Sequence, residues 1–399
     1  MFPGPPRATI SRCEGKKTAK SGFWGAQGEP GDGWSVVRRN TLFVVAIAAA
    51  LLSATGLAVA QDKDKAAADK PKDFGPIAAR VIHMQTAFSP ALPGSGEGVR
   101  IFSRTVKHTS GGTLAIKIVE PGRIAPTADM LDAVIAGDLE AAFTWSGYAA
   151  AKAPVFGVFA TVPFGPGPED MTSWMLEGDG SRIHREAYEK LGVVGIPCGI
   201  QGAKGGGWFR TELNSVADFK GQRLRFGRYA GEVVAKLGAT QVPLPPGEFF
   251  YKLQQGTVDG GEMSTPAIDA ALGFDKLGLP YYMPGWQQPS AVLDFLMRKD
   301  KWETLSPMLR IQVETACRAN IAWMLSRSPH LQGTAMEKLR ASGVVIKPWS
   351  PELLKVFRAK SEIVLKEQAE RDPDFAAALA NQRAFISQSI DWRKLSRLP

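Results

Sequence analysis

The amino-acid sequence predicts an α/β fold. Short segments of strand character alternate along the chain with segments of helical character. Examples of the first are Val81 to Gln85 and Leu114 to Val119, and an example of the second is Thr127 to Ala136. This alternation is typical of α/β proteins. The chain has 399 residues, of which 44% are hydrophobic. That length and composition suffice for two domains or for one large domain.

The remaining elements follow from local patterns. Further strands are predicted at 139–145, 193–197, 291–297 and 344–349, and further helices at 98–108, 306–327, 350–371 and 374–390. Pro307, Pro351 and Pro373 stand at the starts of the last three helices. Proline suits a first turn because its missing N–H would have no partner within the helix. The helix at 306–327, with about 21 residues, is expected to be roughly 30 Å long.

The first 60 residues predict a secretory signal peptide with an extended basic region. Arg38 and Arg39 precede an unbroken apolar run from Leu42 to Leu52, and Ala58-Val59-Ala60 supplies small residues for cleavage. These features form the pattern of a signal peptide, and the apolar run is too short to span a bilayer. We expect export to the periplasm, cleavage after Ala60 and a linker at 61–80. A start codon further downstream and export by the twin-arginine route both remain open.

Charge and cysteines exclude several classes of protein. The formal net charge is +9, but residues 1–60 hold seven basic and three acidic residues, so +5 remains for residues 61–399. This mild excess contains no basic block, so no nucleic-acid binding is expected. Cys13, Cys198 and Cys317 provide neither metal spacing nor a disulfide framework, and Cys198 is predicted to be a buried packing thiol. No Ser/His/Asp order or carboxylate pair indicates an enzyme.

Three segments indicate a site for a small carboxylate. The segments Lys204 to Arg210, Gln222 to Gly227 and Gly256 to Met263 each resemble a strand end followed by a turn with glycine. Arg225 lies between two apolar residues, so strand alternation places it on the opposite face from both. Arginine offers a rigid fork of donors that matches a carboxylate. From the pattern alone, a solvent-exposed strand arginine is equally open.

Several aromatic residues stand near predicted strand or loop ends. Trp145, Tyr148, Trp208 and Trp286 are candidates for the walls of a pocket, and each is equally compatible with a place in the core. Gln85, at the end of the first strand, is a weaker candidate.

The run from Glu248 to Glu262 resembles the signature of the extracytoplasmic solute receptors of TRAP transporters. The flanking Gly207-Trp208-Phe209-Arg210 and Tyr281-Tyr282-Met283-Pro284-Gly285-Trp286 resemble the branch that binds α-keto and α-hydroxy acids. The resemblance extends from about Val81 to about Trp392. It implies a first lobe that begins with 81–205, a second lobe at 206–290, and a region at 291–399 with a lobe-crossing strand, a long spanning helix and C-terminal helices.

The resemblance also implies a function. A receptor of this kind captures a small 2-oxo or 2-hydroxy monocarboxylate between its lobes and delivers it to small and large membrane subunits. Arg225 falls on the carboxylate-binding arginine of the family. Glu262 and Met263 fall on the pair that supplies a carboxylate and a backbone carbonyl to a sodium or calcium ion, although the branch has tryptophan in place of Met263. Gln288 lies where the branch tends to have an acid, so an altered ligand contact is expected there.

Lys204 departs from the pattern of the branch, which has a glutamine that helps to hold the cation. An ammonium group has three donors and no acceptor, so it would repel a cation and is able to replace it. We therefore expect the acid to be bound without metal through Lys204 and Arg225. The alternative is a cation held by Glu262, with Lys204 directed to solvent from a flexible glycine loop.

Three further expectations concern partners and function. The protein is expected to be a monomer, because little chain follows Trp392 and some relatives dimerise through a long C-terminal helix. A periplasmic enzyme acting on a small carboxylate remains open as an alternative. So does a sensor receptor that works without a transporter.

Overall fold

The computed structural model describes residues 79–160 and 162–396. The predicted signal peptide and residues 61–78 of the predicted linker lie outside the described residues. Within the described part of the chain, no helix is both long enough and apolar enough to cross a membrane.

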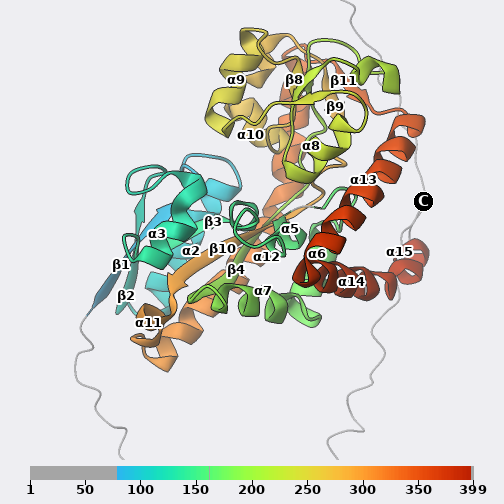
Figure 1. The fold of residues 1–399 in the computed structure, drawn as a ribbon. Coiled ribbons are helices and arrows are strands. Elements are labelled where there is room, and N and C mark those ends of the chain that lie inside the picture. The colour runs from blue at the N-terminus through green and yellow to red at the C-terminus, as the bar shows by residue number, and fades with distance from the viewer. Residues whose placement is uncertain (1–78, 161, 397–399) are drawn as a thin grey trace, which may run out of the picture. The chain divides into compact units, whose positions relative to one another are not determined.

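The described chain forms two β-sheets with helices packed against them (Figure 1). The first sheet contains, in spatial order, β2 (Leu114–Val119), β1 (Arg80–Thr86), β3 (Ala141–Trp145), β10 (Ala291–Arg298) and β4 (Val193–Gln201). β1 pairs in parallel with β2 and β3, whereas β10 runs antiparallel to β3 and β4. As predicted, the strand that begins at Val193 is an edge strand, although it extends to Gln201 rather than ending at Pro197.

The second sheet is built from shorter strands. In spatial order it contains β11 (Ile346–Pro348), β9 (Tyr281–Met283), β5 (Gly207–Phe209), β8 (Gly260–Gly261), β6 (Arg223–Arg225) and β7 (Thr240–Gln241). β6 pairs in parallel with β7 and β8, and β5 runs antiparallel to β8 and β9. The strand ends of β6 and β8 therefore lie side by side, which matters for the site described below.

Fourteen α-helices and three short 3-10 helices complete the described part of the chain. The helices are α2 (Ser95–Thr109), α3 (Met130–Ala136), α4 (Ser146–Ala149), α5 (Phe156–Ala160), α6 (Pro168–Glu177), α7 (Gly180–Glu189), α8 (Arg228–Ala235), α9 (Pro246–Gln254), α10 (Pro266–Ala271), α11 (Lys299–Glu303), α12 (Pro307–Ala341), α13 (Pro351–Arg371), α14 (Pro373–Ser387) and α15 (Ile390–Ser396), with 3-10 turns at η1 (Thr127–Asp129), η2 (Val216–Phe219) and η3 (Phe274–Leu277).

The chain crosses between the sheets in two extended segments. It leaves the first sheet after Gln201 and enters the second at Gly207, and it returns between β9 and β10. β10 is then inserted between β3 and β4, as the sequence predicted for a strand that leads back. The two crossing segments contact each other, because the backbone N–H of Lys204 donates to the carbonyl of Gln288 at 3.1 Å.

Helix α12 connects the cores of both sheets, as predicted, but its predicted length was wrong. It contains 35 residues and is therefore roughly 50 Å long. The prediction ended near Arg327 because Pro329 lacks an N–H and disfavours helix in the residue before it. The helix continues through Pro329 because both halves are anchored: Val313 packs in the core of the first sheet and Leu339 in that of the second.

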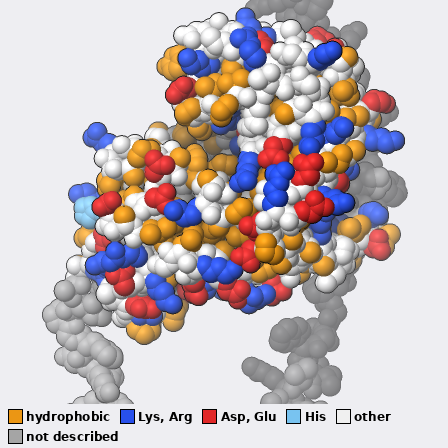
Figure 2. All heavy atoms as spheres, viewed as in Figure 1, with side chains coloured by type: hydrophobic (Ala, Val, Ile, Leu, Met, Phe, Trp, Pro, Cys, Tyr) orange, Lys and Arg blue, Asp and Glu red, His pale blue; other side chains and the backbone are white. Residues whose placement is uncertain are grey.

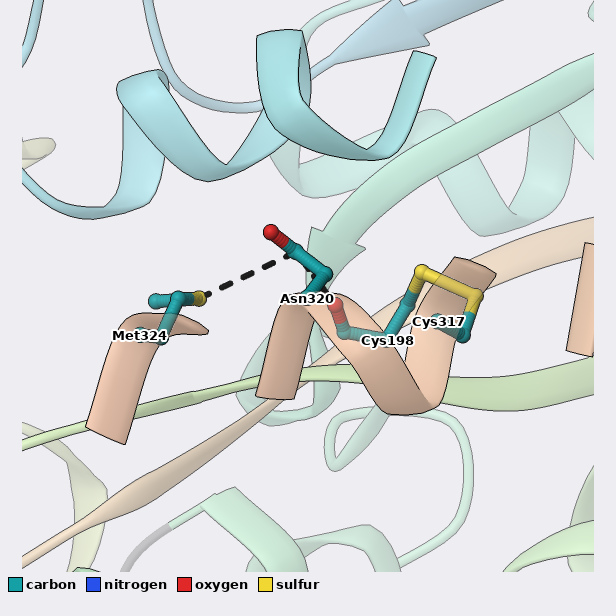
Figure 3. Close-up of a disulfide and its surroundings, with 4 residues drawn as sticks. All are labelled: Cys198, Cys317, Asn320 and Met324. Atoms are coloured by element: carbon teal, nitrogen blue, oxygen red, sulfur yellow. Dashed lines mark hydrogen bonds between the residues drawn. A yellow bond between two sulfur atoms is a disulfide. The ribbon is translucent and has the colours of Figure 1, made fainter. Parts of the chain in front are cut away.

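Cys198 and Cys317 form a disulfide, so the predicted free thiol at Cys198 was wrong. The bond joins β4 to α12 (Figure 3). Beside it, Nδ2 of Asn320 donates to the carbonyl of Cys198 at 2.6 Å. The two cysteines lie 119 positions apart in the sequence. Their spacing therefore carries no local signal, and only the packing of α12 against β4 brings them together.

We expect the disulfide to stabilise the folded protein by about 2–5 kcal/mol, because a cross-link over a long loop restricts the unfolded chain. Cys198→Ala combined with Cys317→Ala should lower the midpoint of urea unfolding, and dithiothreitol should lower the wild-type midpoint to a similar value. The variant should respond to neither reductant nor oxidant. Two reactive thiols in native protein that lacks residues 1–60 would contradict the assignment.

Candidate ligand-binding site

A pocket of about 410 Å³ collects most of the predicted site residues. It lies where the surface is hollowed between the region of α9 and α10 and the region of α3 (Figure 2). The predicted residues that line it are Trp145, Tyr148, Lys204, Arg225, Glu262, Met263 and Gln288. Trp208, Trp286 and the weaker candidate Gln85 do not line it.

The glycine pair of β8 places Glu262 beside Arg225. A Cβ atom at Gly261 would lie 2.1 Å from the carbonyl oxygen of Arg225, so only glycine permits this approach of the two strands. Glu262, the residue after Gly261, also contacts Arg225, because its backbone N–H donates to the Arg225 carbonyl at 3.0 Å. The Gly-Gly-Glu run thus delivers a carboxylate to the end of β6.

Arg225 lies at the end of β6 with its side chain 12% exposed. Its Nη1 donates to the carbonyl of Glu262 at 2.6 Å and to Oε1 of the same residue at 3.2 Å. Its Nε donates to the carbonyl of Leu244 at 3.4 Å. No described residue accepts a hydrogen bond from Nη2. The guanidinium is therefore held on one side and has donors left on the other.

Glu262 is buried and both of its carboxylate oxygens have hydrogen-bond partners. Oε2 lies 2.8 Å from Nζ of Lys204, and Oε1 accepts from the backbone N–H of Gly227 at 3.1 Å in addition to Arg225. Burial raises the pKa of Glu262, but the charges of Lys204 and Arg225 outweigh burial, so the pKa lies below its ordinary value. The group is therefore ionised at neutral pH.

Lys204 is held in place by its backbone, not carried on a flexible loop. The following residues Gly205 and Gly206 are buried, and a Cβ atom at Gly205 would lie 1.8 Å from the hydroxyl of Tyr281. The carbonyl of Gly205 accepts from Nε2 of Gln287 at 2.6 Å. The Lys204 side chain is 12% exposed and its Nζ lies 5.5 Å from the centre of the Trp145 ring. The alternative with Lys204 directed to solvent was wrong.

The pocket carries a net positive charge. Lys204, Arg225 and Glu262 are the charged residues among the described residues that line it. Two cationic groups and one carboxylate leave a single positive charge. Because opposite charges attract strongly in a partly desolvated pocket, this arrangement suits a ligand with one negative charge.

The residues present do not fit a sodium or calcium ion at Glu262 and Met263. Hard cations such as calcium require several oxygen ligands, supplied by carboxylates, carbonyl groups and water. Both carboxylate oxygens of Glu262 are already paired with cationic or N–H donors. Within the described ranges, no group of three or more His, Cys, Asp or Glu residues is placed to hold a metal. An ammonium group lies beside the carboxylate that a cation would need.

Two of the aromatic candidates line the pocket and two belong to the core. Trp145 and Tyr148 meet edge to face, with ring centres 5.3 Å apart. Burial raises the pKa of Tyr148, so its hydroxyl remains a donor. Trp208 is fully buried and stacks on Tyr281 at 4.2 Å, and Trp286 is also buried. Placing Trp208 on a pocket wall was wrong, because strand alternation in the short β5 turns it towards the core of the second sheet.

Gln85 has a structural role beside the pocket. Its Oε1 accepts from the backbone N–H groups of Ile124 and Ala125 at 2.7 and 3.1 Å. It is buried and does not line the pocket. It holds the loop that leads to Thr127, and Thr127 does line the pocket.

Sequence reasoning missed most of the uncharged lining. These residues are Ala87, Phe88, Leu92, Thr127, Ala128, Gln201, Gly227, Leu244, Pro245, Pro246, Ser264, Ile268 and Leu272. They come from loops, from helices and from the end of β4, far apart in the sequence, and share no pattern. A second cavity of about 210 Å³ shares Trp145, Gly227, Glu262 and Gln288 with the pocket and is otherwise lined largely by alanine and glycine.

A buried polar cluster lies apart from the pocket lining. Asp294 accepts from the hydroxyls of Ser146 and Tyr188, both at 2.7 Å, and lies 2.9 Å from Nε2 of His184. The side chains are fully buried. The carboxylate is the hub here, whereas in a catalytic triad the histidine lies between the nucleophile and the carboxylate. The cluster therefore supplies hydrogen-bond partners to a buried carboxyl group and does not resemble a nucleophilic centre.

The fold and the pocket define a binding protein for a small anion, and comparison with known proteins gives the family. A model of bacterial extracellular solute-binding proteins, family 7, matches residues 89–372. A monocarboxylate 2-oxoacid-binding periplasmic protein of Nostoc is 31% identical over 316 residues, which cover 79% of this chain and 86% of that protein. The chain belongs to this family of solute-binding proteins.

Solved structures of TRAP transporter solute-binding proteins have the same fold. The protein from Bordetella bronchiseptica, a dimer with calcium and picolinate, has a TM-score of 0.76 and 28% identity, over 80% of this chain and 95% of that one. The protein from Pseudoalteromonas atlantica, with sodium and pyruvate, has a TM-score of 0.75 and 29% identity, over 79% and 97%. The predicted two-lobed fold class and the predicted receptor function are confirmed.

Asp269 in α10 generates a prediction about pH. It is fully buried and accepts from Nε1 of Trp208 and from the backbone N–H of Ser264, both at 2.9 Å. Burial raises the pKa of Asp269 to about 7 despite these donors. The folded pKa is above the unfolded value of about 3.9, so the stability gained from protonation is present below that value and is lost as pH rises through about 7.

We expect the wild-type free energy of unfolding to fall by about 1 kcal/mol from pH 6 to pH 8 relative to Asp269→Asn. Urea unfolding at pH 6, 7 and 8 measures the difference. Asp300→Asn is a matched control, because Arg298 lowers the pKa of that exposed carboxylate to about 2, outside this range. Identical pH profiles of the wild type and Asp269→Asn would refute the prediction.

Proposed function

We propose that this receptor binds a small 2-oxo or 2-hydroxy monocarboxylate in the pocket around Arg225. The observation that carries the proposal is the single net positive charge formed by Lys204, Arg225 and Glu262 within a largely apolar lining. One carboxylate neutralises that charge, whereas a second carboxylate would lack a cationic partner.

The donors that remain suit such a ligand. Nη2 of Arg225 has no acceptor among the described residues, and Nζ of Lys204 has three N–H groups of which Glu262 takes one. Arginine binds carboxylates through its donor fork, and an oxygen on the neighbouring carbon of the ligand is placed to accept from the lysine. Leu244, Met263 and Ile268 offer apolar surface for the rest of the acid.

The relatives support this ligand class. The Nostoc protein is described as binding monocarboxylate 2-oxoacids, and the structures from Pseudoalteromonas atlantica and Colwellia psychrerythraea contain pyruvate. The proposal extends to the site residues named from the sequence, with Trp145, Tyr148, Met263 and Gln288 as walls of the pocket. It excludes Trp208, which is buried in the core.

We further propose that the protein is cleaved after Ala60, acts in the periplasm and delivers its ligand to TRAP membrane subunits without changing it. The pocket supports binding rather than catalysis. The Ser264 hydroxyl, for example, accepts from the amide of Gln201 at 3.2 Å and has no histidine partner among the described residues. A nucleophilic serine would need a base within hydrogen-bond reach.

A ligand panel tests the proposal. Protein lacking residues 1–60 is screened by thermal shift and then by calorimetry against pyruvate, longer and branched 2-oxo acids, lactate, succinate and glucuronate. We expect the 2-oxo monocarboxylates to raise the melting temperature most, because a ligand that binds only the folded state stabilises it by mass action. Incubation should return the acid unchanged. Stronger stabilisation by succinate or glucuronate, or conversion of the acid, would contradict the proposal.

Arg225→Ala should weaken binding of the strongest acid in that panel by at least about 100-fold, because a buried carboxylate would lose its charged partner. Arg225→Lys should not restore affinity, because a point charge cannot reproduce the fork. Arg223→Ala is the matched control: it lies in the same strand but pairs with Asp259 at 2.7 Å, away from the pocket. Near-normal calorimetric affinity in Arg225→Ala, with a normal melting temperature, would reject the role.

A further inference from the structure

We propose that Lys204 takes the place of a metal cation in this pocket, so that the receptor binds its acid without sodium or calcium. The inference rests on the proposed monocarboxylate function. It separates this chain from the relatives whose structures contain pyruvate together with sodium or calcium.

The first argument is that a lysine ammonium has the same charge as a sodium ion. A sodium ion and a lysine ammonium each carry one positive charge. With Lys204 beside the ionised Glu262 and with Arg225 on its other oxygen, the pocket has a net charge of one without any ion. Adding a cation would place a third positive charge next to two others in a site that is almost fully buried, where like charges repel strongly.

The second argument is that both carboxylate oxygens of Glu262 already have positively charged partners. Oε2 of Glu262 faces the ammonium at 2.8 Å, and Oε1 accepts from Arg225 and from Gly227. A cation at this carboxylate would have to displace Lys204. Among the described residues that line the pocket, Glu262 is the single carboxylate, so no second anionic ligand is offered in exchange.

The third argument is that the ammonium is positioned in advance. The Lys204 backbone is bonded to the carbonyl of Gln288 in the opposite crossing segment. A Cβ atom at Gly285 would lie 2.1 Å from the Lys204 carbonyl, so the two crossing segments are in close contact at this point. The side chain then lies between Glu262, which follows β8, and Trp145, which ends β3.

The ammonium therefore lies beside residues at strand ends of both sheets, as a bridging ion would. An ion has to be recruited from solution, whereas Lys204 is part of the chain and costs no loss of translational freedom on binding. Ligand affinity should then be insensitive to sodium and calcium.

The test uses calorimetry with pyruvate, and with whichever 2-oxo acid gives the largest thermal shift. Wild-type protein lacking residues 1–60 is titrated in three buffers: a potassium buffer with EDTA, the same buffer with calcium in place of EDTA, and a sodium buffer. We expect dissociation constants that agree within about twofold. Elemental analysis of the native protein and a calcium titration without acid should both show no stoichiometric metal.

Lys204→Gln removes the ammonium and supplies an oxygen ligand. We expect its affinity in EDTA to fall by about tenfold or more, and calcium or sodium to restore part of it. Lys236→Gln is the matched control, since Lys236 pairs with Glu367 at 2.9 Å outside the pocket. Melting temperatures of both variants exclude unfolding as the cause.

Three results would overturn the inference: a wild-type affinity that falls about tenfold in EDTA and recovers with metal, stoichiometric calcium in the wild type, or unchanged affinity of folded Lys204→Gln in EDTA. Binding that occurs only with metal would leave the monocarboxylate receptor intact. If no acid of the panel binds in any buffer, the proposed function fails, and this inference with it.

Discussion

The structure around the pocket depends on one buried carboxylate and its partners. Burying Glu262 is costly unless its charge is compensated, and Lys204, Arg225 and the backbone N–H of Gly227 supply that compensation. Lys204 comes from the first crossing segment, whereas Arg225 and Gly227 come from the end of β6 and the start of α8. The carboxylate therefore fixes how the end of β6, the start of α8 and the first crossing segment meet, and the geometry available to a ligand follows from it.

The scaffold that brings these segments together is stiff where they meet. The first crossing segment is packed against the second. Gly261 and Gly285 allow backbones to approach more closely than any side chain would permit, and Gly205 leaves room for the hydroxyl of Tyr281. Helix α12 runs between the cores of the two sheets, and the disulfide fastens it to β4. The ligand donors are thus held by backbone contacts and not by long mobile loops.

Family membership identifies the fold and the class of protein, whereas the residues of the pocket determine how the ligand is bound. Sequence and fold identify a solute-binding protein of family 7, and the matches to relatives of about 30% identity cover 79% of this chain. A shared fold does not transfer the details of a site. With the ammonium of Lys204, the protein itself supplies a positive charge beside Glu262, although it shares the two-lobed architecture of its relatives.

Local patterns in the sequence determined the α/β class and most strands, because alternation and glycine turns act over a few residues. They placed Arg225 on the opposite strand face from its apolar neighbours but did not decide whether that face meets a pocket or solvent. They also marked Lys204 as unusual. They did not decide where its side chain goes: its partner Glu262 lies 58 positions further along the chain. The Cys198–Cys317 bond, the continuation of α12 past Pro329, the burial of Trp208 and the apolar lining of the pocket likewise rest on contacts between distant segments. Such contacts exist only once the two sheets have packed, so only the tertiary structure could decide them.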